Sequence, residues 1–234
     1  MYNSEYEKYK KQLLKENKEN EKNQDNDTVS KDATAVTNEI DTYTSLSVGY
    51  SDDTRGIMDP DPFGYEMNIV WVGEDEVGKR TLLKHFAKEG EFISDYRAVL
   101  GIKPYSRFEL VDNKKICYSI REISSEGKIK SMRSLFFKIT DAAFVIFDLT
   151  NRISFNKTES WIEELRKANN ELVIILVGTK NDLNNERKIN KNEAEDLAKK
   201  VQAFKYVETS GNTGENLEEI FMMLSRKLIE KRES

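Results

Sequence analysis

The chain has 234 residues, of which 38% are hydrophobic and 34% charged, and its formal charge of −5 argues against a general nucleic-acid-binding protein, which needs a basic surface. The single cysteine, Cys117, excludes an intramolecular disulfide and a cysteine-rich zinc site. No stretch approaches the roughly 20 apolar residues of a membrane-spanning helix.

Residues 1–66 hold most of the polar excess, and we predict that they form an acidic, largely disordered extension. They carry 8 Lys and Arg against 15 Asp and Glu, whereas residues 67–234 have a net charge of +2. Residues 15–32 contain one apolar residue, too few to offset the entropy cost of ordering. Residues 4–17 carry a narrow apolar stripe at helical spacing, which indicates a short helix that either frays in solvent or docks on a partner.

From residue 67 onward, continuous apolar runs alternate with amphipathic helical patterns. Such runs are typical of a mostly parallel sheet with helices on both faces. Two of the runs flank a short polar turn and predict an antiparallel hairpin at one edge. We therefore predict an α/β domain over residues 67–234 with a six-stranded sheet. The predicted strands are 67–72, 107–110, 115–120, 142–149, 171–177 and 204–209.

A glycine-containing segment follows the first predicted strand and precedes a helix predicted from Lys79. Gly73, four further residues and then Gly78-Lys79 match the phosphate-loop pattern. In that pattern backbone N–H groups wrap phosphate oxygens, while the lysine and the helix N-terminus attract the anion. The alternative is a surface turn that binds nothing. The predicted phosphate-binding residues are Gly73, Glu76, Val77, Gly78, Lys79, Arg80 and Thr81.

Arg80 departs from this pattern, which has Ser or Thr at that position to ligate magnesium. A guanidinium cannot ligate a cation, and the Thr81 side chain should point about 100° further around the helix. Asp75 and Glu76 add negative charge to a loop that is expected to hold an anion. We expect Arg80 to compensate partly by pairing with one of these two acids or with a phosphate.

A second motif, Thr179-Lys180-x-Asp182, follows the predicted strand 171–177. A carboxylate at Asp182 can accept two hydrogen bonds from guanine N1–H and the exocyclic amine, which adenine cannot supply, and a lysine stem can pack over the base. Alone, this short motif is weak. Downstream of a phosphate loop, it resembles the guanine-specificity element of Ras-superfamily GTPases, and the resemblance implies a guanine nucleotide site with Thr179, Lys180 and Asp182 as base-binding residues.

The segment 208–221, ETSGNTGENLEEIF, resembles a further element of that family, whose backbone after the serine contacts guanine O6. It adds Ser210, Gly211 and Asn212 to the candidate base-binding residues, with Asn212 standing where the family usually has Lys. Residues 67 to about 230 share the order and spacing of a small GTPase. The resemblance implies a P-loop NTPase fold and GTP or GDP as the ligand.

The segments YRAVLGI and FDLTNRISFNKTESWIEEL resemble the Rab branch most closely. In that alignment Phe92 falls where an aromatic ring stacks on the guanine edge, although it can equally be a hydrophobic anchor of its loop. Val99 replaces a threonine that contacts magnesium and the γ-phosphate. Glu122 replaces the magnesium-side Asp, and Glu126 replaces the water-orienting Gln. We therefore expect weakened Mg²⁺ binding, with Glu122 reaching a metal only through water, and no efficient catalytic residue.

The resemblance, with these departures, predicts an atypical Rab-like protein that binds guanine nucleotide and hydrolyses GTP slowly or not at all. It would act as a regulatory interaction module, with a role in vesicle trafficking implied by the family. One alternative is a true GTP-hydrolysing switch that depends on an external activator. The other is a nucleotide-free structural subunit.

Protein effectors or a complex are the expected partners, bound through the switch-equivalent face and residues 1–66, and nucleic acid is not expected. Rab proteins usually end in prenylated cysteines, whereas this sequence ends LIEKRES and has Tyr2 in place of a myristoylated glycine. We therefore expect no direct lipid anchor. The expected location is the cytoplasm, with recruitment to an intracellular membrane by a partner.

Overall fold

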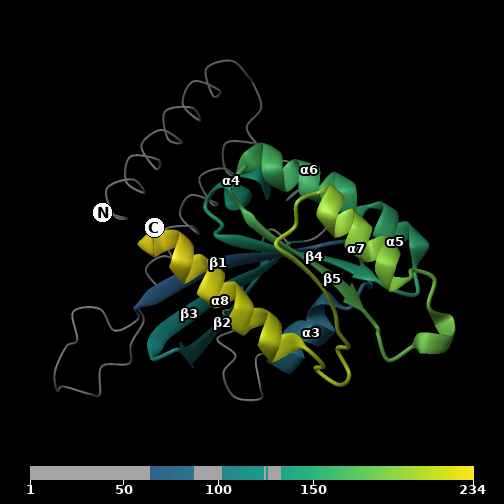
Figure 1. Cartoon of the computed structure of the whole chain (residues 1–234), viewed down its shortest axis with the longest axis horizontal. Helices are drawn as coiled ribbons and strands as arrows, with labels where there is room; N and C mark the ends of the chain where they lie inside the picture. The colour runs from purple at the N-terminus through teal and green to yellow at the C-terminus, as the bar shows by residue number, and fades with distance from the viewer. Residues whose placement is uncertain (1–63, 87–101, 124, 126–132) are drawn as a thin grey trace, which may run out of the picture. The chain divides into compact units, whose positions relative to one another are not determined.

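A computed structural model describes residues 64–86, 102–123, 125 and 133–234, with only the backbone of residues 102–104, 106 and 108. Figure 1 draws the remaining residues as a thin grey trace. The predicted extension, except for its last three residues, lies outside the described part of the chain. So do Phe92, Val99 and Glu126.

Six strands form one sheet in the order β2-β3-β1-β4-β5-β6. They are β1 (Tyr65–Val72), β2 (Ile102–Val111), β3 (Lys114–Ile123), β4 (Ala142–Asp148), β5 (Val173–Thr179) and β6 (Lys205–Glu208). All neighbouring strands are parallel except the antiparallel pair β2 and β3. Their two-residue turn, Asp112 and Asn113, has positive φ at both positions, as a tight hairpin turn requires. The predicted mostly parallel sheet with an edge hairpin is confirmed.

Helices cover both faces of this sheet, as the sequence predicts (Figure 1). On one face α3 and α8 pack against each other, and the other face carries α4, α5, α6 and α7. The helices are α3 (Lys79–Phe86), α4 (Arg133–Lys138), α5 (Arg152–Asn156), α6 (Thr158–Ala168), α7 (Lys191–Lys200) and α8 (Leu217–Glu233), with a short 3₁₀ turn, η2 (Asn184–Glu186).

The core explains why the central strands read as continuous apolar runs. Every residue of β4 and β5 is buried, because both faces of each strand are covered by helices. On the α8 side, Trp71 of β1 stacks on Phe144 and Phe221 at centroid distances of 5.2 and 6.3 Å. On the opposite side, Phe147 of β4 packs edge-on against Phe155 of α5. This packed centre brings the carboxyl ends of β1, β4 and β5 to one edge of the sheet.

Two strand boundaries differ from the predicted ones in a way that affects the site. β5 runs from Val173 to Thr179 rather than over 171–177, and β4 ends at Asp148 rather than at 149. Their parallel register pairs Asp148 with Thr179, so the two strands finish together. The first residue of the predicted base motif is therefore the last residue of a buried strand.

Candidate functional site

The loop between β1 and α3 closes around the ammonium group of Lys79. Lys79 is 5% exposed, and its Nζ donates hydrogen bonds to the carbonyl oxygens of Gly73 at 2.8 Å and Glu74 at 2.7 Å. Burial lowers the lysine pKa, and the negative charge of Glu122 opposes that shift. The loop therefore holds a buried amine at the start of α3, where a phosphate-binding lysine is expected.

Gly73 has a backbone conformation that only glycine can adopt here. Its φ is +142°, and a Cβ atom at this position would lie 2.1 Å from the carbonyl oxygen of Ile146 on β4. Gly78 also has a positive φ, +94°, just before α3 begins. The spacing of the two glycines thus reflects the bend of the loop and its close approach to β4. Glu76, between them, is exposed and has a φ of 63°.

Trp161 of α6 fixes the first half of this loop. Its side chain is 4% exposed and packs within the core. The indole Nε1 of Trp161 donates a hydrogen bond to the Glu74 carboxylate at 3.1 Å. The guanidinium of Arg133 lies 4.4 Å from the Trp161 ring centroid and also pairs with Glu164. Sequence reasoning missed Glu74, and no local signal connects it with a residue 87 positions away.

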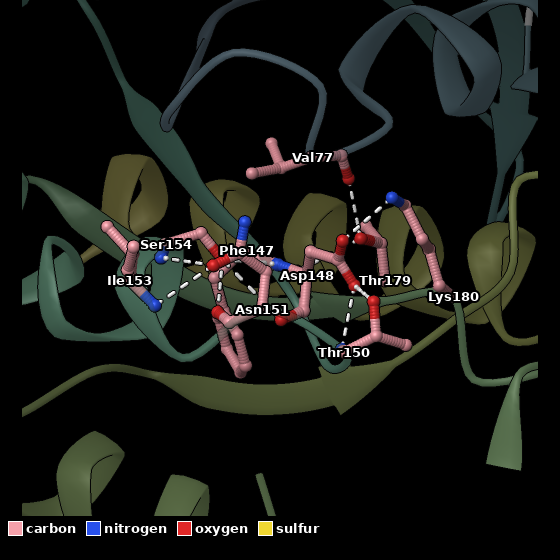
Figure 2. A network of polar contacts seen from close by, with 9 residues as sticks. All are labelled: Val77, Phe147, Asp148, Thr150, Asn151, Ile153, Ser154, Thr179 and Lys180. Atoms are coloured by element: carbon pink, nitrogen blue, oxygen red, sulfur yellow. Dashed lines mark hydrogen bonds and ion pairs between the residues drawn. The ribbon is translucent and has the colours of Figure 1, made fainter. Parts of the chain in front are cut away.

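Thr179 joins the base motif to the phosphate loop (Figure 2). Its buried hydroxyl lies 2.5 Å from the carbonyl oxygen of Val77 and 3.0 Å from that of Phe147, so its single proton is shared between two acceptors. The Thr179 side chain is therefore buried between the phosphate loop and the end of β4. The base-binding role of Thr179 stays a prediction, and in the structure its hydroxyl bonds to these two backbone oxygens.

Lys180 is held by an acid that the sequence analysis missed. Its Nζ lies 2.7 Å from Oδ2 of Asp148, which is 4% exposed (Figure 2). The other carboxylate oxygen, Oδ1, accepts hydrogen bonds from the Thr150 backbone at 2.7 Å and hydroxyl at 2.8 Å. The sequence signal that could have identified Asp148 was a single acid directly after six apolar residues at the carboxyl end of a strand. The head of Lys180 is thereby fixed, which leaves its stem to line the site.

Asp182 and Asn212 meet from two different loops. The Nδ2 amide of Asn212 donates to Oδ2 of the exposed Asp182 carboxylate at 2.9 Å. Hydrogen bonds from the Ser210 hydroxyl and the Asn212 amide lower the pKa of Asp182, so the carboxylate is ionised at neutral pH. The structure thus brings together the predicted base-binding residues Lys180, Asp182, Ser210, Gly211 and Asn212.

Arg187 links the loop after β5 to strand β6, a contact that the sequence did not predict. Its guanidinium forms a bidentate pair with Glu208 at 2.9 and 2.7 Å and donates to Oδ1 of Asn181 at 2.8 Å. Tyr206 donates to the same Glu208 carboxylate at 2.8 Å. Burial raises the pKa of Glu208, but the Arg187 and Tyr206 hydrogen bonds outweigh it and lower the value overall. The base motif is therefore anchored to β6.

Arg80 contacts Glu122, rather than the Asp75 or Glu76 that the sequence predicts as its acidic partners. Its Nε lies 3.5 Å from Oε2 of Glu122, and the two side chains are 63% and 11% exposed. The buried Oε2 atom accepts no hydrogen bond from a described residue. Thr81, the nearest hydroxyl along α3, is exposed.

This donor set does not fit the magnesium ion that the fold implies. The Arg80 guanidinium lies against Glu122, the acid that the sequence predicts at the magnesium side, and it carries no lone pair to offer a metal. Among the described residues, no group of three or more His, Cys, Asp or Glu side chains is arranged to hold a metal ion. In the same residues, no helix combines the length and apolar character that crossing a bilayer requires.

Comparison with known proteins agrees with this geometry. The model of the Ras family matches residues 68–230. The Ras-related protein RABA4a of Arabidopsis thaliana is 30% identical over 174 residues, which is 74% of this chain and 74% of that protein. The Ras-related protein rab-39 of Caenorhabditis elegans is 30% identical over 172 residues, 71% and 74% of the two chains. Ras-related protein Rab11D of Nicotiana tabacum is 29% identical over 178 residues, 76% and 77% of the two chains.

The family match spans well over half of the chain, and it includes the predicted phosphate loop and both predicted base-binding segments. The order of strands and helices is that of the P-loop fold which the sequence predicts. The chain therefore belongs to the Ras family, as a Rab-like small GTPase.

Proposed function

We propose that this chain binds GTP and GDP selectively, hydrolyses GTP slowly, and acts as a regulatory interaction module in intracellular membrane trafficking. The observation that carries the nucleotide-binding part is the pairing of Asp182 with Asn212 beside a fixed Lys180. An exposed, ionised carboxylate is a suitable acceptor for the two guanine donors. Thr179 ties this group to the phosphate loop, so base and phosphate contacts belong to one rigid unit.

Selectivity for guanine follows from the charge on Asp182. With adenine bound, the carboxylate would face an acceptor nitrogen and would lose its hydration without gaining a donor. Sites built to hydrogen-bond a ligand reject an analogue that lacks those donors by factors on the order of 10⁴. We therefore expect a large preference for GDP over ADP that resides in this one side chain.

Slow hydrolysis is supported by the residue types at three positions. Glu126 stands where the resemblance expects the water-orienting glutamine, Val99 has no oxygen to offer, and Arg80 replaces the metal-binding hydroxyl. Phosphoryl transfer depends on positioning and on charge stabilisation, and these substitutions weaken both. The trafficking role and the binding of effectors through the switch-equivalent face rest on the family alone. So does recruitment to a membrane by a partner.

The test begins with the nucleotide that copurifies with the full-length chain, followed by titration with fluorescent GDP, GTP and ADP. We expect bound guanine nucleotide and weak competition by ADP. Asp182→Asn should abolish the preference, because an amide presents a donor to guanine N1–H. Asp196→Asn, an exposed acid on α7, is the matched control. No binding at millimolar nucleotide would contradict the proposal and favour a structural subunit, whereas rapid GTP turnover would favour a true switch.

A further inference from the structure

We propose that the Arg80 guanidinium, held by Glu122, replaces the divalent cation of this site, so that nucleotide binds with equal affinity in the presence and absence of magnesium. This inference rests on the proposed guanine nucleotide binding. It concerns how the phosphates are neutralised, and it makes no use of the base-binding residues.

Arg80 lies at the helix end next to the phosphate loop. It follows Lys79 directly and is the second residue of α3, so both side chains extend from the helix end that follows the phosphate loop. Lys79 is buried and already donates to two loop carbonyl oxygens. Arg80 is 63% exposed, and no described residue accepts a hydrogen bond from its guanidinium. It is therefore the cation at this helix end that is accessible to an incoming phosphate.

The second step is the role of Glu122. This acid lies at the carboxyl end of β3, paired in register with Trp71, two residues before the phosphate loop begins at Gly73. Its side chain is 11% exposed, and its Oε2 has no hydrogen bond within the described residues. Arg80 is the ion-pair partner of this buried oxygen. A buried acid without a cation would repel the phosphates, so Glu122 requires a positive group here.

The third step is that an arginine and a magnesium ion exclude each other at this point. The guanidinium already lies 3.5 Å from Oε2 of Glu122, and its positive charge would repel a divalent cation at the same carboxylate. Arginine faces Glu122 with Nε as an ion pair, which leaves its two terminal nitrogens, whose planar fork matches phosphate oxygens. The ion pair is partly exposed and therefore weak, so the guanidinium can adjust to a ligand at little cost.

The loop charges make such a cation necessary. Asp75 and Glu76 are exposed acids within the phosphate loop, and Glu74 is a third acid next to them. In the described part of the loop and the first turn of α3, the positive groups are Lys79 and Arg80. One buried lysine against three loop acids and a diphosphate leaves an excess of negative charge. Removing Arg80 should therefore weaken phosphate binding more than base binding.

The experiment measures the affinity of the full chain for fluorescent GDP in excess MgCl₂ and in EDTA. For the natural sequence we expect the two dissociation constants to agree within about threefold. Arg80→Ala should weaken GDP binding by about tenfold or more in both conditions, and Arg80→Lys, which keeps the charge, should lose less. Lys84→Ala, one turn further along the exposed side of α3, is the control and should not change either constant.

A double variant, R80S/E122D, is designed to restore a metal site. It should bind GDP at least about tenfold more tightly in MgCl₂ than in EDTA. Thermal unfolding identifies any variant that fails to fold, and Arg80→Lys keeps the proposal testable in that case. If natural-sequence binding weakens tenfold or more in EDTA, the inference is wrong while the proposed function stands. If GDP does not bind in either condition, the proposed function itself fails.

Discussion

Gly211 lies directly against Thr81. This contact joins the segment 208–221, predicted to bind the base, to helix α3, which begins after the phosphate loop. A Cβ atom at position 211 would lie 2.7 Å from Cγ2 and 2.9 Å from Cβ of Thr81. Contacts this short force a neighbour to move. The Thr81 side chain therefore leaves no room for a Cβ atom at position 211, and the two residues are in contact across 130 positions of sequence.

This contact predicts that Gly211→Ala destabilises the fold by about 1–3 kcal/mol, as overpacking does. The measurement is urea unfolding of the single and double variants. Thr81→Ser removes the methyl group, so Gly211→Ala should cost less in that background, although the contact with the Cβ atom remains. Additive effects of the two substitutions would contradict a direct contact.

The phosphate loop could be predicted from sequence because its information is local. The bend at Gly73 and the position of Lys79 at the start of α3 need only the spacing of a few residues between a strand and a helix. The mostly parallel sheet with an edge hairpin was likewise predictable, since apolar runs separated by helices admit few topologies. The end of β5 was not, because it is set by register against β4, where Asp148 and Thr179 pair.

The partners of charged residues could not be predicted for a related reason. Arg80 was expected to pair with Asp75, Glu76 or a phosphate, and the acid that the fold brings to it is Glu122 from the end of β3. Trp161 and Glu74 meet only because α6 packs beside the loop. The type of a residue restricts the groups that its side chain can bind. Which of these groups is nearby depends on the fold, which brings the ends of particular strands together.

The hydroxyl of Thr179 should stabilise the junction of the two nucleotide loops. Thr179→Val keeps the shape and β-branching but leaves the buried Val77 carbonyl without its 2.5 Å donor. We expect a loss of about 1–3 kcal/mol in the free energy of unfolding, measured in urea. The same variant should bind GDP more weakly because the loops lose their connection. Thr179→Ser retains the hydroxyl and should recover most of both losses, and equal defects in the two variants would argue for a packing effect.

Cys117 should resist modification in the native protein. It is 4% exposed within β3, and burial, assisted by the negative charge of Glu66, raises its thiol pKa to about 12. Only about one thiol in 10⁴ is then ionised at pH 8, and the thiolate is the reactive form. We expect native labelling by a disulfide reagent to be at least about 100-fold slower than labelling in urea. Fast native labelling would show that β3 opens readily.

Asn212 should act on the ionisation of Asp182. Hydrogen bonds from Ser210 and Asn212 lower the Asp182 pKa below its ordinary value, so the native state favours the carboxylate. These bonds stabilise the fold above the unfolded-state pKa, and their contribution is lost as pH falls through the lower, folded-state value. Asn212→Ala removes one donor and should move the Asp182 pKa upward, toward its ordinary value.

Carbon NMR of the Asp182 carboxyl group, followed from neutral pH into the acid range, measures this directly and without nucleotide. The titration midpoint should rise in Asn212→Ala, while Asn184→Ala, an exposed residue in the neighbouring 3₁₀ turn, should leave it unchanged. The proposed guanine recognition needs the ionised form of Asp182, so affinity for GDP should decline at a higher pH in Asn212→Ala than in the natural sequence. An unchanged midpoint would mean that the 2.9 Å contact between Asn212 and Asp182 does not persist in solution.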